Sequence, residues 1–310
     1  MRRSVSESVV SPSQSAPATE QHTLEGAVVF AGVGLHTGTR VRAAILPAPA
    51  DTGIVFLRTD VKGDGRIVAQ AGNVVSTRLS TVLGNASGVT VSTVEHLMAA
   101  LWALDVDNAV VELDGPEAPI MDGSSLPFVN LIDRVGRRRQ ETLRQAIEIL
   151  QPVEVSDGER RAALLPAPRF EVAVQIAFDS AAIGRQSLDM AVGEAAFRAE
   201  LADCRTFGFL HEVEALRQAG LAQGGSLDNA IVVDGDELLN PEGLRRPDEF
   251  VRHKAVDAIG DLATLGRPLI GRYEGRFAGH AMNNALVRAL LAQPDAFRLR
   301  PPIMALAKAI

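Results

Sequence analysis

The chain has 310 residues, 46% of them hydrophobic, and this length is enough for about two domains, each with its own core. Its net charge of −7 argues against a nucleic-acid partner, and no apolar run approaches the roughly 18 residues of a transmembrane segment. Cys204 is the only cysteine, which excludes internal disulfides, cysteine-rich zinc fingers and iron–sulfur sites. The scarcity of cysteine favours a reducing, cytoplasmic compartment and leaves His and carboxylate groups as the metal ligands of any metal site.

Residues 1–21 predict a disordered leader, because Ser, Pro and Ala dominate and no hydrophobic periodicity is present. The chain begins with Met1 and two arginines, but no apolar stretch follows, so the segment lacks the pattern of a signal peptide. A solvated extension is favoured over a targeting tail.

The next part of the chain predicts an α+β domain over residues 22–138. Its expected strands are residues 27–30, 41–46, 54–57 and 109–113, and its expected helices are residues 92–104 and 126–135. Residues 134–144 carry five Arg and few apolar side chains. We place the domain boundary there and interpret the stretch as a solvated linker rather than a contact to an anionic ligand.

The second half, residues 139–310, repeats this plan. Its expected strands are residues 147–155, 161–165, 171–178, 187–192 and 229–233, and its expected helices are residues 193–201, 248–265 and 282–291. The region before residue 225 is less regular. No identity-level repeat is visible, but the order of elements suggests a duplicated α+β unit.

The helix expected over residues 248–265 carries an unusual polar stripe. His253, Asp257 and Asp261 follow one another at intervals of four residues, which puts them on one side of the helix. An imidazole and a carboxylate one turn apart can bind the same cation. Taken alone, however, the pattern is more typical of a solvated His–Asp pair.

A second candidate segment begins at Ser92. Ser92 and Glu95 match a capping box, and on that interpretation His96 is an ordinary, partly buried histidine. The functional alternative makes His96 a third metal ligand and Glu95 a base beside it. Three protein ligands, an open position for water and a nearby carboxylate are what a hydrolytic zinc site needs.

Two further segments carry polar groups next to small or aromatic residues. His280 stands between Gly and Ala at the start of a helix. It is either an ordinary polar residue at the helix N-terminus or a cation that stabilises an oxyanion, and in the second case Asp261 is placed to orient it. Thr206 precedes Phe207, and its hydroxyl either polarises a carbonyl or belongs to a strand-end turn. Spacing does not decide between these alternatives.

Together these segments resemble one family, the UDP-3-O-acyl-N-acetylglucosamine deacetylases of lipid A synthesis. The matching motifs, in the family's order, are residues 32–38 (GVGLHTG), 92–101 (STVEHLMAAL), 120–129 (IMDGSSLPFV), 205–209 (RTFGF), 224–234 (GGSLDNAIVVD), 248–260 (DEFVRHKAVDAIG) and 279–284 (GHAMNN). They cover roughly residues 22–300. The chain departs from the family pattern in its longer leader and in Ala278, where the family often has Ser.

The resemblance implies one Zn²⁺ per chain, with the ligands His96, His253 and Asp257. It also implies that Glu95 is the general base that activates the attacking water and that the Thr206 hydroxyl polarises the amide carbonyl. His280, held by the carboxylate of Asp261, is implied to be a protonated histidine. The implied substrate contacts are Lys254 toward the phosphates, Phe207 at the sugar, and His36 in the turn that borders the cleft.

The implied fold is α+β, with two similar two-layer sandwich domains whose helices pack between two outer sheets. Each domain carries an insert, and the second, about residues 207–227, forms an apolar passage for the acyl chain. Its expected lining is Phe209, Leu210, Val213, Leu216 and Leu221. The implied partner is a UDP-linked acylated amino sugar, whose N-acetyl group is hydrolysed to acetate and a free amine by a cytoplasmic monomer.

Two rival functions remain open at this point. One is another zinc amidase of the same architecture that acts on a different acylated amine. The other is a noncatalytic metal-binding or scaffold protein. A fusion with a dehydratase that acts on acyl carriers is excluded, because 310 residues leave no room for a further domain of about 150 residues.

Overall fold

The computed structural model describes residues 20–300. Most of the leader expected over residues 1–21 lies outside this range, but Glu20 and Gln21 already belong to strand β1 (Glu20–Leu24). Strand structure therefore already includes the last two residues of the predicted leader.

The arginine-rich stretch expected as a solvated linker over residues 134–144 is instead largely a strand, β10 (Arg137–Leu143), which pairs antiparallel with β1. Its arginines find carboxylates far away in the sequence, for example Arg139, which lies 2.8 Å from Glu20 on the paired strand. The prediction was wrong because these partners become visible only once the two strands are side by side.

The first half of the chain builds a five-stranded sheet. Its strands, in sheet order, are β2 (Val28–Val33), β3 (Arg40–Pro47), β9 (Ala109–Leu113), β4 (Ile54–Arg58) and β5 (Arg66–Val68). Strands β4 and β9 are parallel and the other neighbours are antiparallel. In β3, Val41 and Ala43 are buried while Arg42 between them is exposed, so alternation directs one face of the sheet toward the core.

The second half builds a sheet of the same topology. Its strands, in sheet order, are β12 (Val153–Asp157), β13 (Arg160–Leu165), β20 (Arg272–Arg276), β14 (Glu171–Ala177) and β15 (Arg185–Ala191). Again one inner pair, β14 and β20, is parallel and the other neighbours are antiparallel. The shared strand order agrees with the duplicated unit suggested by the sequence, although β20 was not among the predicted strands.

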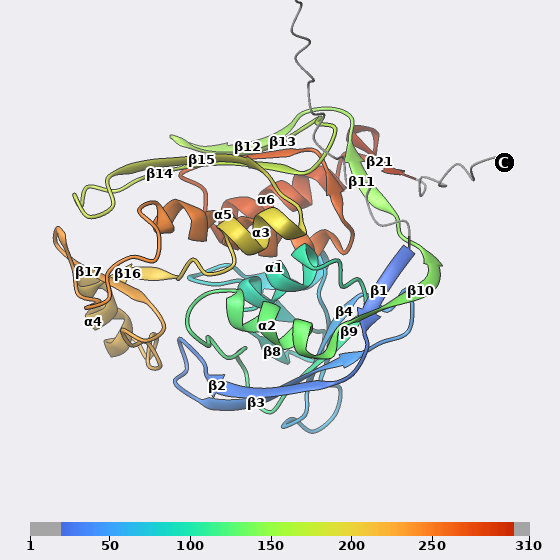
Figure 1. The fold of residues 1–310 in the computed structure, drawn as a ribbon, viewed down its shortest axis with the longest axis horizontal. Helices are drawn as coiled ribbons and strands as arrows, with labels where there is room; N and C mark the ends of the chain where they lie inside the picture. Colours follow the sequence, from blue (N-terminus) through green and yellow to red (C-terminus); the bar gives the residue numbers. More distant parts are fainter. Residues whose placement is uncertain (1–19, 301–310) are drawn as a thin grey trace, which may run out of the picture.

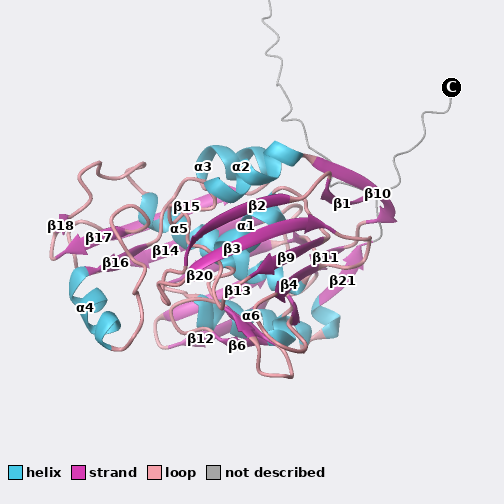
Figure 2. Ribbon diagram, turned by 90° about the horizontal axis from the view of Figure 1, so that it is seen from below, coloured by secondary structure: helices cyan, strands magenta, loops and turns pink. Residues whose placement is uncertain are grey.

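The main helices lie between these two sheets. They are α1 (Glu95–Ala103), α2 (Leu126–Val135), α3 (Glu194–Glu200), α5 (Glu249–Leu262), which continues into the 3₁₀ turn η2 (Ala263–Leu265), and α6 (His280–Leu291). Figure 1 shows the sheet of β12 to β15 above this helical layer and the sheet containing β2 and β3 below it. Figure 2, seen from below, shows β2, β3, β9 and β4 across the helices. The predicted fold class, two α+β sandwiches with the helices inside, is confirmed.

Three smaller sheets complete the described part of the chain. The first contains β6 (Val74–Ser76), β7 (Val82–Gly84) and β8 (Thr90–Val91), and the second contains β19 (Leu269–Ile270), β11 (Ala146–Ile149) and β21 (Phe297–Arg300). The stretch 147–155, expected as one strand, therefore divides between β11 and β12, which join different sheets. The two short 3₁₀ turns η1 (Ala71–Asn73) and η3 (Pro294–Ala296) lie in connections.

The third small sheet belongs to a segment at the side of the molecule. It consists of β16 (Phe207–Phe209), β17 (Ile231–Asp234) and β18 (Glu237–Leu238), with helix α4 (Leu210–Gln218) following β16 (Figure 1). The region predicted to be less regular thus contains a strand and a helix. No residue of α4 is buried, so this helix packs less tightly than the five central ones.

Helices α1 and α5 approach each other closely at one glycine. A Cβ atom added at Gly260 of α5 would lie 2.0 Å from the backbone oxygen of Glu95 on α1, a distance that no side chain can occupy. The absence of a side chain therefore lets the start of α1 lie directly on α5.

The substitution Gly260→Ala is expected to lower the free energy of unfolding by about 1–3 kcal/mol, since the clash is with backbone and one helix must shift. Chemical denaturation followed by circular dichroism measures this change. Gly72→Ala is the matched control, because a Cβ at Gly72 meets no atom within 4 Å. Equal stability of the two variants would show that α1 and α5 have room to separate at no cost.

Candidate metal centre and active site

The start of α1 and the middle of α5 bring three potential metal ligands together. His96 comes from α1, and His253 and Asp257 lie one turn apart on α5, as their spacing predicted. One ligand atom from each lies within 4.8 Å of the others, and all three side chains are buried. We call these three residues the triad.

The distances within the triad suit a small tetrahedral cation. The Asp257 Oδ1 atom lies 3.2 Å from His253 Nε2 and 3.5 Å from His96 Nε2. Ligand atoms placed about 2.0–2.1 Å from one tetrahedral ion are roughly 3.3 Å apart. Two imidazoles and one carboxylate are also a donor set that zinc accepts, so the residues fit that ion.

Neighbouring groups orient the ligand atoms of the triad. The Nδ1 atom of His253 lies 3.0 Å from the backbone oxygen of Cys204, and a hydrogen bond from Nδ1 leaves the Nε2 lone pair facing Asp257. Lys254 donates to Asp257 Oδ2 at 2.7 Å, which leaves Oδ1 toward the histidines. Each α5 ligand is thus fixed by a group outside the triad.

The charges of the triad favour cation binding. Burial lowers the pKa of His96, which keeps its imidazole neutral and able to donate a lone pair. Burial alone would raise the pKa of Asp257, but His253 and Lys254 beside it hold that pKa well below its usual range. Asp257 is therefore a carboxylate.

Glu95, directly before His96, is not a helix cap. Helix α1 begins at Glu95 with Val94 as its N-cap and no side-chain capping bond, so the capping-box alternative is wrong. The Glu95 Oε2 atom instead accepts from the backbone N–H of Thr81 at 3.1 Å. Burial, helped by the nearby carboxylates Asp261 and Asp257, raises the pKa of Glu95 to about 7, in the range of a general base.

His280 and Asp261 form a buried pair beside Glu95. His280 Nδ1 lies 2.9 Å from Asp261 Oδ2, and its Nε2 faces Glu95 Oε1 at 3.9 Å. Burial works against the charge of His280, but Asp261 outweighs it and raises the pKa of His280 to about 10. His280 is therefore an imidazolium at neutral pH, as its pairing with Asp261 was expected to make it.

Asp261 is held by residues that sequence reasoning missed. Thr81 donates to its Oδ1 at 2.5 Å and Asn283 to its Oδ2 at 2.8 Å, while Tyr273 donates to Asn283 at 2.6 Å. A signal for Asn283 was available, because it stands three residues after His280 and so lies on the same side of α6. No comparable signal points to Thr81 or Tyr273, which come from a loop and a strand.

Glu117 is a further residue that sequence reasoning missed, and it organises the turn that contains His36. Its fully buried carboxylate accepts from the backbone N–H groups of His36 and Thr37, each at 2.9 Å, and from the Thr93 hydroxyl at 2.7 Å. Thr93 has a φ of 56°, a conformation unfavourable for a β-branched residue, two positions before Glu95. The Glu117 carboxylate therefore ties this turn to the chain that leads into α1.

The remaining expected site residues form two groups, one close to the triad and one in the insert segment. Lys254 Nζ lies 5.5 Å from the centre of the Phe207 ring while it binds Asp257, so these two residues adjoin the metal ligands. Thr206 follows Cys204 by two positions and donates its N–H to Gly123 at 2.9 Å.

Three further apolar residues expected in the site, Phe209, Leu210 and Val213, lie in the insert segment. They belong to β16 and α4 and are only partly buried. The backbone of His36 accepts from Gln223 N at 3.1 Å, so the turn at His36 borders this insert segment.

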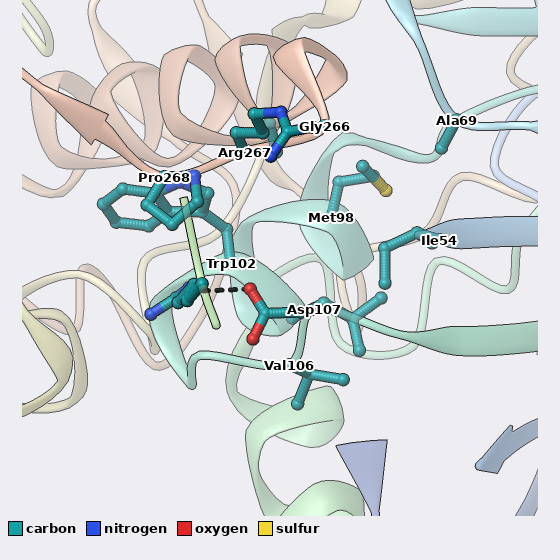
Figure 3. A pocket seen from close by; sticks show the side chains of 12 residues that line it. Ile54, Ala69, Met98, Trp102, Val106, Asp107, Gly266, Arg267 and Pro268 are labelled. Atoms are coloured by element: carbon teal, nitrogen blue, oxygen red, sulfur yellow. Dashed lines mark hydrogen bonds and ion pairs between the residues drawn. The ribbon is translucent and has the colours of Figure 1, made fainter. Parts of the chain in front are cut away.

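Figure 3 shows a pocket that is separate from the triad, at the other end of α1. Met98 and Trp102 of α1 face it together with Pro268. Its charged wall contains Asp107 and Arg144, which pair with each other at 2.7 Å. Arg144 is neutralised in this way, whereas Arg267, which also lines the pocket, donates to the side-chain oxygen of Gln145 at 3.0 Å. Within residues 20–300, moreover, no helix has the length and apolar character of a bilayer span.

Comparison with known proteins agrees with this geometry. The chain is 66% identical over 291 residues to the UDP-3-O-acyl-N-acetylglucosamine deacetylase of Phenylobacterium zucineum, covering 94% of this chain and 99% of that protein. It is 50% identical to the enzyme of that name from Myxococcus xanthus, covering 91% and 89%, and 46% identical to the one from Neisseria meningitidis, covering 89% and 92%.

The profile of one family extends across both sandwiches and all the site residues described above, from residue 21 to residue 292. Such a match, together with relatives aligned over nearly their whole length, confirms the resemblance drawn from the motifs. The chain belongs to the family of UDP-3-O-acyl N-acetylglycosamine deacetylases, hydrolases that cleave an amide.

Proposed function

We propose that the protein hydrolyses the N-acetyl group of UDP-3-O-(3-hydroxyacyl)-N-acetylglucosamine with one zinc ion held by the triad. The products are acetate and the free glucosamine amine, in an early committed step of lipid A synthesis. The observation that carries this proposal is the placement of Glu95 and of the His280–Asp261 pair directly beside the buried triad.

His96, His253 and Asp257 would hold the ion through Nε2, Nε2 and Oδ1. A bound zinc ion supplies Lewis-acid polarisation of the amide carbonyl and a lowered pKa for a water molecule. The chain contributes the two imidazoles, the carboxylate and the hydrogen bonds that orient them.

Glu95 would act as the general base. Its carboxylate adjoins the ligand His96, and its pKa near 7 lets it accept a proton from the attacking water at neutral pH. The hydrogen bond from Thr81 fixes one carboxylate oxygen and leaves Oε1 on the side of His280. Glu95 is thus the group that takes the proton as the C–O bond forms.

His280 would stabilise the negative charge that develops on the carbonyl oxygen. Its imidazolium is fixed through Nδ1 by Asp261, so Nε2–H points into the site beside Glu95. We propose that the Thr206 hydroxyl adds a further hydrogen bond to this oxygen. The departing nitrogen needs a proton when the C–N bond breaks, and either His280 Nε2 or the newly protonated Glu95 can donate it.

Substrate binding is assigned to the residues around this centre. Lys254 lies beside Asp257 and over Phe207, where a cation can face a phosphate and an aromatic ring can face the sugar. His36 is proposed to border the cleft, and Phe209, Leu210 and Val213 of the insert to line the passage for the acyl chain. The single cysteine of the chain, the buried Cys204, suits the proposed cytoplasmic location.

Acetate release from two substrates tests the substrate assignment. The purified protein is incubated with the UDP-linked sugar that carries the 3-O-acyl chain and with the same sugar without it. We expect a much lower kcat/KM for the second, because the insert residues then have no chain to bind. Equal kcat/KM values would favour a zinc amidase with another acylated amine as its substrate.

The pH profile of kcat/KM is expected to be bell-shaped. Glu95 must be deprotonated, and since a bound cation lowers its pKa from about 7, the acid limb falls at or below pH 7. His280 must be protonated, so activity declines as pH rises toward its pKa of about 10. His280→Gln should lower the rate and remove the alkaline limb, and an unchanged bell in that variant would take His280 out of its role.

A further inference from the structure

A buried ion pair lies behind the triad, where the chain passes from α3 to β16. Arg205 is 2% exposed and stands between Cys204, whose carbonyl oxygen binds His253, and Thr206. Its partner Glu249 is the first residue of α5 and is 0% exposed. None of the steps proposed above uses either side chain.

Glu249 binds both the backbone and the side chain of Arg205. Its Oε1 atom accepts from the Arg205 backbone N–H and from Nε–H, both at 2.9 Å. Its Oε2 atom accepts from the backbone N–H of Arg245 at 2.6 Å and from Arg205 Nη2 at 3.3 Å. The remaining Arg205 donors go to Glu242 and to the Gly243 carbonyl oxygen, so the guanidinium is fixed on every side.

Glu249 and His253 are four residues apart and therefore lie on the same side of α5. The chain segment 204–206 is thus attached to this side of α5 at two adjacent points. At one, Glu249 holds the Arg205 backbone N–H, and at the other, the Cys204 carbonyl meets His253 Nδ1 at 3.0 Å. The position in which Glu249 holds the Arg205 backbone therefore sets the position of the neighbouring Cys204 carbonyl oxygen against the imidazole of His253.

The ion pair fixes geometry more than it stabilises the fold. Taking a guanidinium and a carboxylate out of water costs several kcal/mol per ion, and their attraction repays this only with additional hydrogen bonds. Here those bonds are present and directional, since one carboxylate accepts from two backbone N–H groups and the guanidinium. Such a group holds one arrangement of the segment 204–206 where apolar side chains would allow several.

We propose that Glu249, acting through Arg205, is a positioning residue for the metal ligand His253 and so sets the affinity of the triad for a divalent cation. This inference rests on the proposed metal centre. Groups that orient a ligand imidazole from behind typically change metal affinity by about 10–100-fold when they are removed. The same fall is expected here for variants that loosen the segment 204–206.

The test is zinc affinity, measured by competition with a chromophoric chelator. Glu249→Gln keeps the size of the side chain but replaces one acceptor oxygen by a donor, so either Arg205 or Arg245 loses its acceptor. We expect its zinc Kd to rise by about 10-fold or more and the visible spectrum of the cobalt-substituted protein to change. Arg205→Lys, which keeps the charge but loses the planar guanidinium, should act in the same direction and serves if Glu249→Gln does not fold.

Asp107→Asn is the matched control. Asp107 also accepts from an arginine, Arg144, and from a backbone N–H, that of His22, but it lies at the far end of α1 (Figure 3). This variant should lower the unfolding midpoint while its zinc Kd and cobalt spectrum stay as in the wild type. Wild-type zinc affinity and spectrum in folded Glu249→Gln and Arg205→Lys would overturn the positioning role alone, whereas a wild-type chain that binds no zinc would overturn the proposed metal centre.

Discussion

Glu95→Ala is expected to keep its zinc and to lose about 10²–10⁴-fold in kcat. The zinc is retained because Glu95 is not a member of the triad, whose ligand atoms come from His96, His253 and Asp257. The rate falls because, within residues 20–300, the carboxylates nearest to Glu95 are engaged elsewhere: Asp257 belongs to the triad and Asp261 is paired with His280. Steady-state acetate release together with zinc analysis of the same sample measures both effects.

Glu95→Gln is the companion variant, because it keeps the shape of the side chain and the Thr81 N–H can still find an acceptor. A similar loss of rate in both variants would assign the effect to the carboxylate rather than to altered packing. Near-normal turnover in either, with zinc bound, would remove Glu95 from the role of base and would favour a noncatalytic metal site.

His253→Ala is expected to abolish zinc binding at micromolar metal. The substitution removes one of three protein ligands and leaves Asp257 without one of the groups that hold it charged. Acetate release should fall with the zinc content. Elemental analysis after gel filtration gives the number of zinc ions per chain.

His22→Ala is the matched control for this loss. His22 lies on β1, where its backbone N–H, not its ring, donates to Asp107. This variant should retain one zinc ion per chain and its activity. If His253→Ala also retained a full equivalent of zinc, the ligand assignment would be refuted.

The duplicated α+β unit could be predicted because its signals are local, whereas the two sandwiches with their helices inside were implied by the family resemblance. Strands such as β3 alternate buried and exposed residues, and the long helix α5 shows its polar stripe in the spacing of His253, Asp257 and Asp261. The predictions that were wrong concern elements that are stabilised by distant partners. Strand β10 has the composition of a linker, and only the folded chain gives its arginines carboxylates to bind, Glu20 of β1 for Arg139 and Glu194 of α3 for Arg137.

The candidate site likewise contains residues that local sequence signals predict and residues whose role depends on distant parts of the chain. The placement of two ligands on one side of α5 follows from helix geometry. Joining His96 to them requires α1 to lie against α5, which Gly260 permits and which only the family resemblance implied. Glu117 is a comparable case, because its acceptor role depends on a turn about 80 residues before it in the chain. A buried carboxylate that binds backbone N–H groups has no sequence signature of its own.

The central claim is that the triad, with Glu95 and His280 beside it, hydrolyses the N-acetyl group with the help of one bound metal ion. The most direct measurement is acetate release from the UDP-linked, 3-O-acylated N-acetylglucosamine before and after removal of metal by a chelator. We expect activity to disappear with the metal and to return on addition of one equivalent of zinc per chain. Acetate release that is unchanged in the metal-free protein would contradict the claim.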